Sequence, residues 1–278
     1  MNPGEALAAC EAAVRRFDPD RYFASMFAPA EKRPLLFALY AFNHEIARAP
    51  EAAREPMMAA IRLQWWREAV EEARAGRPRA QPAAIGLAQL FAHVSFAPGT
   101  FEALIDAREV ETSPAPFADF AALELHTQAT SAALMRIAAT LLNAEADVNS
   151  LTREAGTAYG LAGILRSIPF HAGRGRTFLP ATLLAASGLT TADALSGRHM
   201  RGRAVVISQI ADAAVAHFAQ ARRMALPKHV MPAVLASSLV PAYLRHATRS
   251  GGDLRSAGDI SQFRRQLVLL RAAMFGKL

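Results

Sequence analysis

The stretch from Tyr159 to Pro180, YGLAGILRSIPFHAGRGRTFLP, gathers the residues best suited to holding a ligand. An apolar segment leads to Pro169, which we expect to break a helix, and a basic glycine turn with His171, Arg174 and Arg176 follows. The stretch contains no carboxylate. Cationic side chains around such a turn attract an anion and repel a metal cation. The stretch therefore predicts a site for an anionic head group.

Common catalytic motifs are missing from the sequence. It has no His-Glu-x-x-His, no Gly-x-Ser-x-Gly and no glycine-rich phosphate loop after a strand. Its eight histidines include no closely spaced pair. His44 and His171 stand out because each interrupts an apolar segment, although a hydrogen-bonded core histidine has the same pattern. The alternating charges around Asp106 and Glu109 favour surface ion pairs over a carboxylate cluster. We predict no metal site.

The elements that must position these residues are predicted to be helices. Alanine is abundant, strand-favouring runs are scarce, and apolar residues recur at three- and four-residue spacing, as in Leu36, Leu39, Tyr40 and Ile46. Prolines, glycines and capping residues set the expected ends. The expected helices span residues 3–17, 20–27, 29–49, 51–75, 82–93, 100–111, 117–143, 147–168, 181–186, 201–224, 229–248 and 260–275, and a capped turn is expected at 190–195. The sequence predicts an all-α fold in one domain, residues 1–278.

Charge and composition limit the cellular compartments and the classes of partner that we expect for this protein. The net charge is +7, and residues 198–278 hold 13 Lys and Arg against 3 Asp and Glu. This basic region could meet anionic lipid, an acidic protein or nucleic acid, but no interleaved aromatics support nucleic acid, which we exclude. The single Cys10 is typical of a reducing compartment. With no apolar run of about 18 residues and no leader-like start, we expect a cytoplasmic protein, with peripheral contact at the inner membrane as the other option.

Several motifs in order resemble the squalene and phytoene synthase superfamily. They are LLFALYAFNHEIAR, LQWWREAVEE, the expected helix over 117–143, and AGTAYGLAGILRSIPFHAGRGRTFLP. The resemblance covers nearly the whole chain, and it implies a single-domain isoprenoid-synthase-type helical fold with a central cavity. The matching scaffold residues are Tyr40, Ala41, Phe42, Arg166, Gly175, Arg176, Phe178, Leu179 and Pro180.

The acids of the family's two metal motifs do not match. The positions of its four metal-binding aspartates hold Ala47, Glu51, Ser167 and His171. Ionising an allylic diphosphate requires Mg²⁺ held by carboxylates, and one carboxylate of four survives. The replacements resemble the non-catalytic branch of the superfamily, which includes an assembly factor of mitochondrial respiratory complex I.

Two functions follow from this resemblance. One is a pseudoenzyme without a cofactor, acting in complex I assembly with a respiratory-complex subunit as partner, or binding an isoprenoid or anionic lipid or a protein. The alternative is a divergent Mg²⁺-dependent head-to-head prenyltransferase that holds its metal with Glu51 together with Asp106, Glu109 or a repositioned acid. For a bound ligand, the expected anion-binding residues are Arg48, Arg166, Arg174 and Arg176, although arginines at a helix end also satisfy its carbonyls. The expected cavity-lining residues are Tyr40, Asn43, His44, Trp66, Gln128 and Tyr159.

Overall fold

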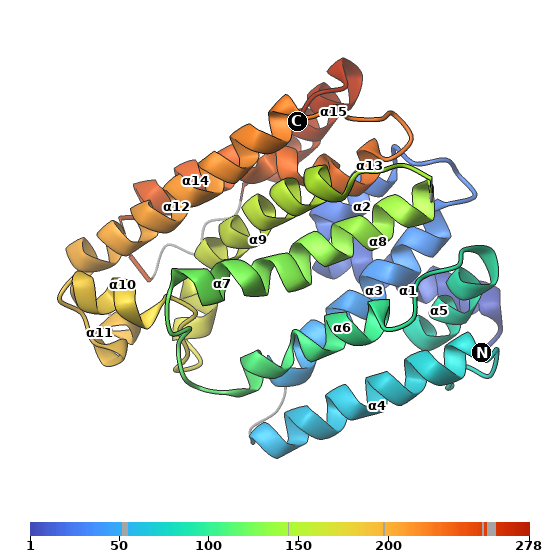
Figure 1. Ribbon diagram of the computed structural model, residues 1–278, viewed down its shortest axis with the longest axis horizontal. Coiled ribbons are helices and arrows are strands. Elements are labelled where there is room, and N and C mark those ends of the chain that lie inside the picture. The colour runs from blue at the N-terminus through green and yellow to red at the C-terminus, as the bar shows by residue number, and fades with distance from the viewer. Residues whose placement is uncertain (52–54, 144, 197, 252, 255–259) are drawn as a thin grey trace. The chain divides into compact units, whose positions relative to one another are not determined.

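The computed structural model describes the chain except residues 52–54, 144, 197, 252 and 255–259 (Figure 1). Every regular element in the described part is a helix, which confirms the all-α prediction. The contacts divide the chain into two compact units. Unit 1 comprises residues 1–113, 134–148 and 226–236, and unit 2 comprises residues 114–133, 149–225 and 237–278. Each unit is described by itself, and the single domain over residues 1–278 stays a prediction.

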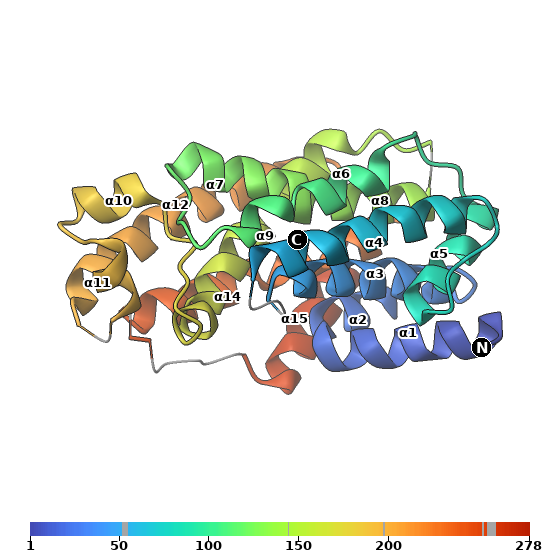
Figure 2. The same cartoon turned by 90° about the horizontal axis from the view of Figure 1, so that it is seen from below.

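Unit 1 is built around α3. Its helices are α1 (Pro3–Phe17), α2 (Pro19–Ser25), α3 (Arg33–Glu51), α4 (Pro56–Arg74), α5 (Pro82–His93), α6 (Thr100–Asp106), the 3₁₀ helix η1 (Glu109–Thr112), α8 (Ala133–Leu142) and α13 (Met231–Val234). Helices α1, α3 and α5 pack against one another (Figure 2). The aromatic ring of Phe42 on α3 lies 5.4 Å from Trp66 and 5.8 Å from Phe101. These rings give unit 1 a closely packed core.

Unit 2 is built around α9 and α12. Its helices are α7 (Phe120–Thr127), the π-helical turn η2 (Gln128–Ala132), α9 (Asn149–Ala172), α10 (Ala181–Ala186), α11 (Thr191–Leu195), α12 (Met200–Arg223), α14 (Val240–Arg249) and α15 (Gln262–Phe275). The 3₁₀ helix η3 (Leu235–Leu239) spans the boundary between the units. Helix α9 packs against α12, α14 and η2, and α12 also packs against α14 (Figure 1).

Helix α12 is, within the described ranges, the one helix long and apolar enough to cross a membrane by length and composition. It packs against α9 and α14, and it carries Arg203, whose side chain is fully buried. Core helices often meet the same criterion, so one such helix is weak evidence for a membrane span. We interpret α12 as a core helix of unit 2.

Prolines account for most of the differences from the expected helix ends. Pro169 does not break a helix, because α9 continues to Ala172. It stands in the last turn, so only three residues follow it in the helix, and it removes one backbone hydrogen bond near the helix end. The helix expected over 229–248 is instead divided into α13, η3 and α14, with Pro232 and Pro241 each in the first turn of a new helix. Helical spacing along the IRLQWWREAVEEA segment predicts a core position for Ile61, but this residue of α4 is 54% exposed.

Candidate functional site

The first pair of motif positions lies on α3 of unit 1. Ala47 is half-buried and Glu51 is exposed at the last residue of the helix. The two positions are one helical turn apart and therefore share a face. An alanine side chain offers no ligand atom, so this face presents at most one carboxylate to a metal.

Tyr40 and Asn43, two predicted cavity-lining residues, are both held in place by arginines. The ring of Tyr40 lies 5.6 Å from the guanidinium carbon of Arg21, and burial raises the pKa of its phenol. Asn43 accepts a hydrogen bond from Arg108 Nη2 at 3.3 Å, and Arg108 Nη1 donates to Glu111 Oε1 at 2.7 Å. Asn43 and Glu111 are buried. The amide of Asn43 is thus part of a structural polar network within unit 1.

His44 stacks on a neighbouring aromatic ring. Its imidazole is 4.5 Å from the ring of Phe17, with an interplanar angle of 10°. Burial lowers the pKa of His44, the Arg48 cation lowers it further, and Asp18 partly opposes the change. The ring is therefore neutral at pH 7 and adds no positive charge to this part of α3.

Arg48, a predicted anion-binding residue, lines a pocket of about 300 Å³ in unit 1. The pocket is formed by α3, α4 and Gln81, and a second arginine, Arg62, also lines it. Glu45 faces the same space and lies 3.9 Å from Arg48. Trp66 lines the pocket too, with 5% of its surface exposed. Two arginines against one carboxylate leave the pocket weakly positive, which suits a small anion.

Gln128 and Tyr159, the predicted cavity-lining residues of unit 2, lie on η2 and α9. Gln128 donates from Nε2 to Glu124 Oε1 at 3.0 Å, so its amide is engaged with the preceding turn. Tyr159 is 7% exposed and belongs to the buried face of α9.

Arg166 on α9 lies over an aromatic ring. Its guanidinium carbon is 4.5 Å from the centre of the Tyr243 ring on α14, a cation–π distance. The hollow beside it, which His246 and Asp253 also line, holds about 20 Å³. That volume is enough for about one water molecule but not for a diphosphate. Arg166 therefore joins α9 to α14 in this structure.

The second pair of motif positions lies in the last turns of α9. Ser167 donates its hydroxyl to the Ile164 carbonyl at 3.0 Å. The His171 imidazole is 7% exposed and lies 5.1 Å from the ring of Phe170 and 4.4 Å from that of Phe178. A serine turned onto its own helix and a histidine between aromatic rings do not form an oxygen-rich cation site.

The predicted basic turn directly follows α9. Gly175 has a φ of +70°, and the His171 carbonyl accepts hydrogen bonds from the backbone N–H groups of Arg174 and Arg176. The guanidinium of Arg174 lies 3.7 Å from the Phe170 ring centre, and that of Arg176 lies 5.5 Å from the Phe178 ring centre. The turn therefore presents two cations on aromatic supports.

The side chains at the four motif positions are unsuited to coordinating Mg²⁺. Of the four motif positions, Glu51 alone supplies a carboxylate. Within the described ranges, no group of three or more His, Cys, Asp or Glu could hold a metal ion. Mg²⁺ requires near-octahedral oxygen coordination, for which these residues are unsuited. The absence of a metal cofactor stays a prediction.

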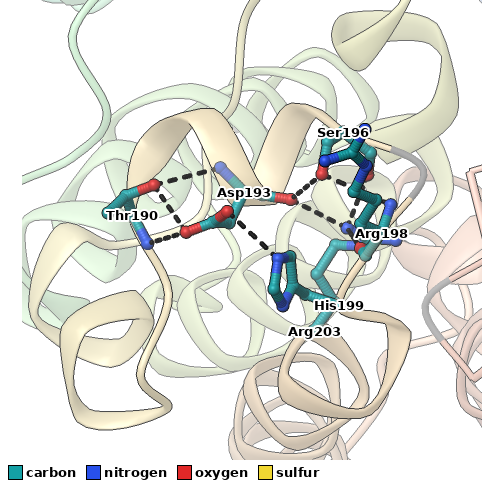
Figure 3. Close-up of polar contacts among 6 residues, drawn as sticks. All are labelled: Thr190, Asp193, Ser196, Arg198, His199 and Arg203. Carbon is teal, nitrogen blue, oxygen red and sulfur yellow. Dashed lines mark hydrogen bonds and ion pairs between the residues drawn. The ribbon is translucent and has the colours of Figure 1, made fainter.

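Sequence analysis missed a buried arginine at the corner between α11 and α12. Arg203 Nη1 donates to the carbonyls of Asp193 at 2.9 Å and Ser196 at 2.7 Å, and also to that of Arg198 (Figure 3). His199 Nε2 lies 3.3 Å from Asp193 Oδ1. Carbonyls at a helix C-terminus need such donors. Arg203 is therefore a structural residue, although its sequence context predicts a basic surface.

A second missed cluster joins three helices of unit 2. His217 Nδ1 on α12 lies 2.6 Å from Glu154 Oε2 on α9, and His217 Nε2 lies 3.5 Å from Glu124 Oε1 on α7. Glu154 is 4% exposed. The three residues are far apart in the sequence, so no local sequence motif predicts this cluster. Their arrangement holds α7, α9 and α12 together.

The squalene/phytoene synthase family model matches residues 14–272 of this sequence. The chain belongs to the squalene/phytoene synthase family. A solved dehydrosqualene synthase has the same fold, with a TM-score of 0.84 at 16% identity, covering 98% of this chain and 97% of that one. The isoprenoid-synthase helical fold expected from the motifs is confirmed.

Two curated family members differ in what their names describe. "NADH dehydrogenase (ubiquinone) complex I, assembly factor 6" of Bos taurus is 27% identical over 248 residues, which are 88% of this chain and 74% of that protein. Presqualene diphosphate synthase of Rhodopseudomonas palustris is 28% identical over 207 residues, 73% of each chain. The family therefore contains relatives of this chain in both an assembly role and a synthase role.

Proposed function

We propose that this protein is a non-catalytic member of the squalene/phytoene synthase family that acts in the assembly of respiratory complex I. The similarity to complex I assembly factors over most of the chain supports the assembly role. The proposal locates the protein in the cytoplasm, in peripheral contact with the inner membrane, and makes a subunit of the respiratory complex its partner.

One observation carries the non-catalytic part of the proposal. The side chains at the four motif positions supply too few oxygen ligands for a metal ion. Ala47 has no side-chain atom that could coordinate a metal. The Ser167 hydroxyl donates a hydrogen bond to the Ile164 carbonyl, and the His171 ring lies between two aromatic rings. A cation that neutralises a leaving diphosphate needs carboxylates at these positions. Glu51 alone cannot supply that coordination.

The remaining basic residues are suited to binding rather than chemistry. Arg174 and Arg176 lie against Phe170 and Phe178 and carry positive charge without a carboxylate in the same stretch. Arginine in this setting holds phosphate or carboxylate groups well. An isoprenoid or anionic lipid is accordingly the ligand class that we propose for this turn.

A deletion strain of the native host tests the assembly role. We expect loss of the gene to lower the amount of fully assembled complex I on native gels, together with NADH:quinone oxidoreductase activity in membranes. The wild-type gene should restore both, and so should an Arg198→Gln control at an exposed residue outside the proposed site. Normal assembly in the deletion strain would reject the role.

A turnover assay tests the non-catalytic part separately. Purified protein incubated with farnesyl or geranylgeranyl diphosphate and Mg²⁺ is expected to form no prenyl-coupled product. A known synthase of the family, run in the same buffer, shows that the assay detects product. Turnover at rates typical of enzymes would overturn the pseudoenzyme proposal while leaving the deletion experiment interpretable.

The second candidate function is a divergent Mg²⁺-dependent prenyltransferase. The similarity to presqualene diphosphate synthase and the carboxylate of Glu51 favour it. Calorimetry with Mg²⁺ and a non-hydrolysable farnesyl diphosphate analogue would then show metal binding that Glu51→Gln abolishes. The matched control is Glu55→Gln, because Glu55 is also an exposed glutamate and, as the N-cap residue of α4, makes no side-chain capping bond. Absence of Mg²⁺ binding in the wild type would discard this alternative.

A further inference from the structure

Helix α15 of unit 2 exposes a continuous apolar stripe. Phe263, Leu267, Leu270 and Met274 recur at intervals of four, three and four residues, which places them on one face. Phe263 is 76% exposed and Met274 is 67% exposed. On the opposite face, residues such as Leu269 are buried. The helix therefore has one apolar face that is buried against the protein and a second apolar face that is exposed to solvent.

The flank of this stripe is purely basic. Arg264 and Arg271 are seven residues apart, and both are exposed. Lys277 is exposed just beyond the C-terminal cap at Gly276. The segment from Gln262 to Phe275 contains no Asp or Glu. A helix with an apolar face and a cationic flank is typical of helices that lie in a membrane interface.

A hollow of about 550 Å³ borders the same helix. Its cationic side chains are Arg222, Arg245, Arg271 and Lys277, and Val268 and Phe275 contribute to its apolar wall. None of the described side chains lining it carries a carboxylate. Positive charge around an apolar floor suits a phosphate-bearing amphiphile. Because Arg271 contributes to both features, the basic flank continues into the hollow.

We propose that α15 lies flat on an anionic lipid bilayer, with its apolar stripe inserted at the acyl boundary and Arg264, Arg271 and Lys277 on the lipid phosphates. The inference deepens the membrane contact of the proposed function and rests on it in that respect, while the vesicle experiments below test α15 separately from the role in complex I assembly.

Charge decides between lipid and a protein partner. Apolar residues at this spacing also suit a partner helix. Pairing with the α15 of a second copy would bring the arginines of both helices close together without compensating acids, which is unfavourable. An anionic membrane surface provides the complementary charge for all three cations at once, at a gain of about fivefold in binding for each.

Vesicle flotation of the full chain tests the proposal. We expect wild-type protein to float with vesicles of phosphatidylcholine and phosphatidylglycerol but not with phosphatidylcholine alone. The binding should weaken as salt is raised, because exposed charges are screened. Arg264→Gln with Arg271→Gln should lower the partition coefficient about 25-fold. The control, Arg201→Gln with Arg249→Gln, removes two exposed arginines elsewhere in unit 2. Its partition coefficient should stay within about twofold of the wild-type value.

The depth of the stripe can be measured with a fluorophore. Cys10 is 1% exposed and burial raises its pKa to about 12, so an introduced cysteine is labelled selectively. A polarity-sensitive dye on Leu267→Cys should shift to the blue when anionic vesicles are added. The same dye on Val215→Cys, which replaces an exposed apolar residue of α12, should not shift.

Three outcomes would overturn the proposal. They are equal binding to both kinds of vesicle, no binding to either, and an unchanged partition coefficient in the double arginine variant. Light scattering that shows a dimer which Leu267→Gln dissociates, without vesicle binding, would assign the stripe to a second copy instead. All the altered residues are exposed, so the variants should keep the wild-type thermal unfolding profile.

Discussion

Gly156 on α9 and Ala132 on η2 are in contact through their backbones. A Cβ atom added to Gly156 would lie 2.2 Å from the Cα of Ala132, closer than any real packing contact allows. One turn later, a Cβ on Gly160 would lie 2.8 Å from Thr127 Cβ. The two glycines let α9 approach the π-helical turn of unit 2 closely.

Gly156→Ala should therefore destabilise the protein. The added methyl group meets backbone atoms that cannot move aside, and overpacking of this kind costs about 1–3 kcal/mol or more. The matched control is Gly163→Ala on the same helix, where a Cβ would meet nothing within 4 Å. It should stabilise by about 0.5–1 kcal/mol, because alanine favours a helix interior. Denaturant unfolding measures both, and equal effects would contradict the packing.

Arg108→Met should destabilise unit 1 far more than Arg67→Met. Arg108 pairs with buried Glu111 at 2.7 Å, and removing one partner of a buried pair costs about 3 kcal/mol. Arg67 pairs with the exposed acids Asp106 and Glu109, so its loss should cost about 0.2–1 kcal/mol. The free energy of unfolding of the two variants is the measurement. Similar losses would mean that the Asn43–Arg108–Glu111 network has no special role.

Arg203→Met should open the corner between α11 and α12. The substitution keeps most of the side-chain volume but leaves the carbonyls of Asp193 and Ser196 without this donor, at a cost of about 3 kcal/mol. Arg201→Met, two residues earlier and exposed, should change stability by less than about 0.5 kcal/mol. Thermal unfolding monitored by circular dichroism compares the two. A cost below about 1 kcal/mol at Arg203 would be inconsistent with a structural cap.

His44 should make stability depend on pH in the weakly acidic range. Its pKa is lowered in the folded protein, mainly by burial, so the unfolded chain binds a proton more readily. The contribution of His44 to the free energy of unfolding is therefore fully present above the ordinary histidine pKa of about 6.5. It is lost as the pH falls toward the lowered pKa of the folded protein.

His44→Phe keeps a ring against Phe17 and should flatten this dependence. Chemical unfolding at a series of pH values measures it, with His93→Gln as the control at an exposed histidine. If the slope is the same in wild type and His44→Phe, the dependence arises elsewhere.

Local features of the sequence determined the helices and the family. Periodicity, caps and prolines act within a few residues, so α5 and α10 begin and end where predicted, and the predicted basic turn around Gly175 is present. At 190–195, where we expected a capped turn, the cap at Thr190 starts the short helix α11. Pro169 shows the limit of such local rules, because packing and its place in the last turn let α9 run past it.

Tertiary structure decided which charged residues are structural and which faces stay open. Arg108 meets Asn43 across 65 positions, and Glu154 meets His217 across 63. Arg203 and the arginines of α15 look alike in the sequence, yet Arg203 is buried while Arg264 and Arg271 are exposed. Burial depends on which helices pack together, and contacts between distant segments leave no local pattern in the chain. For that reason the sequence identified the family, and only the packed helices distinguished a structural arginine from one that can meet a ligand.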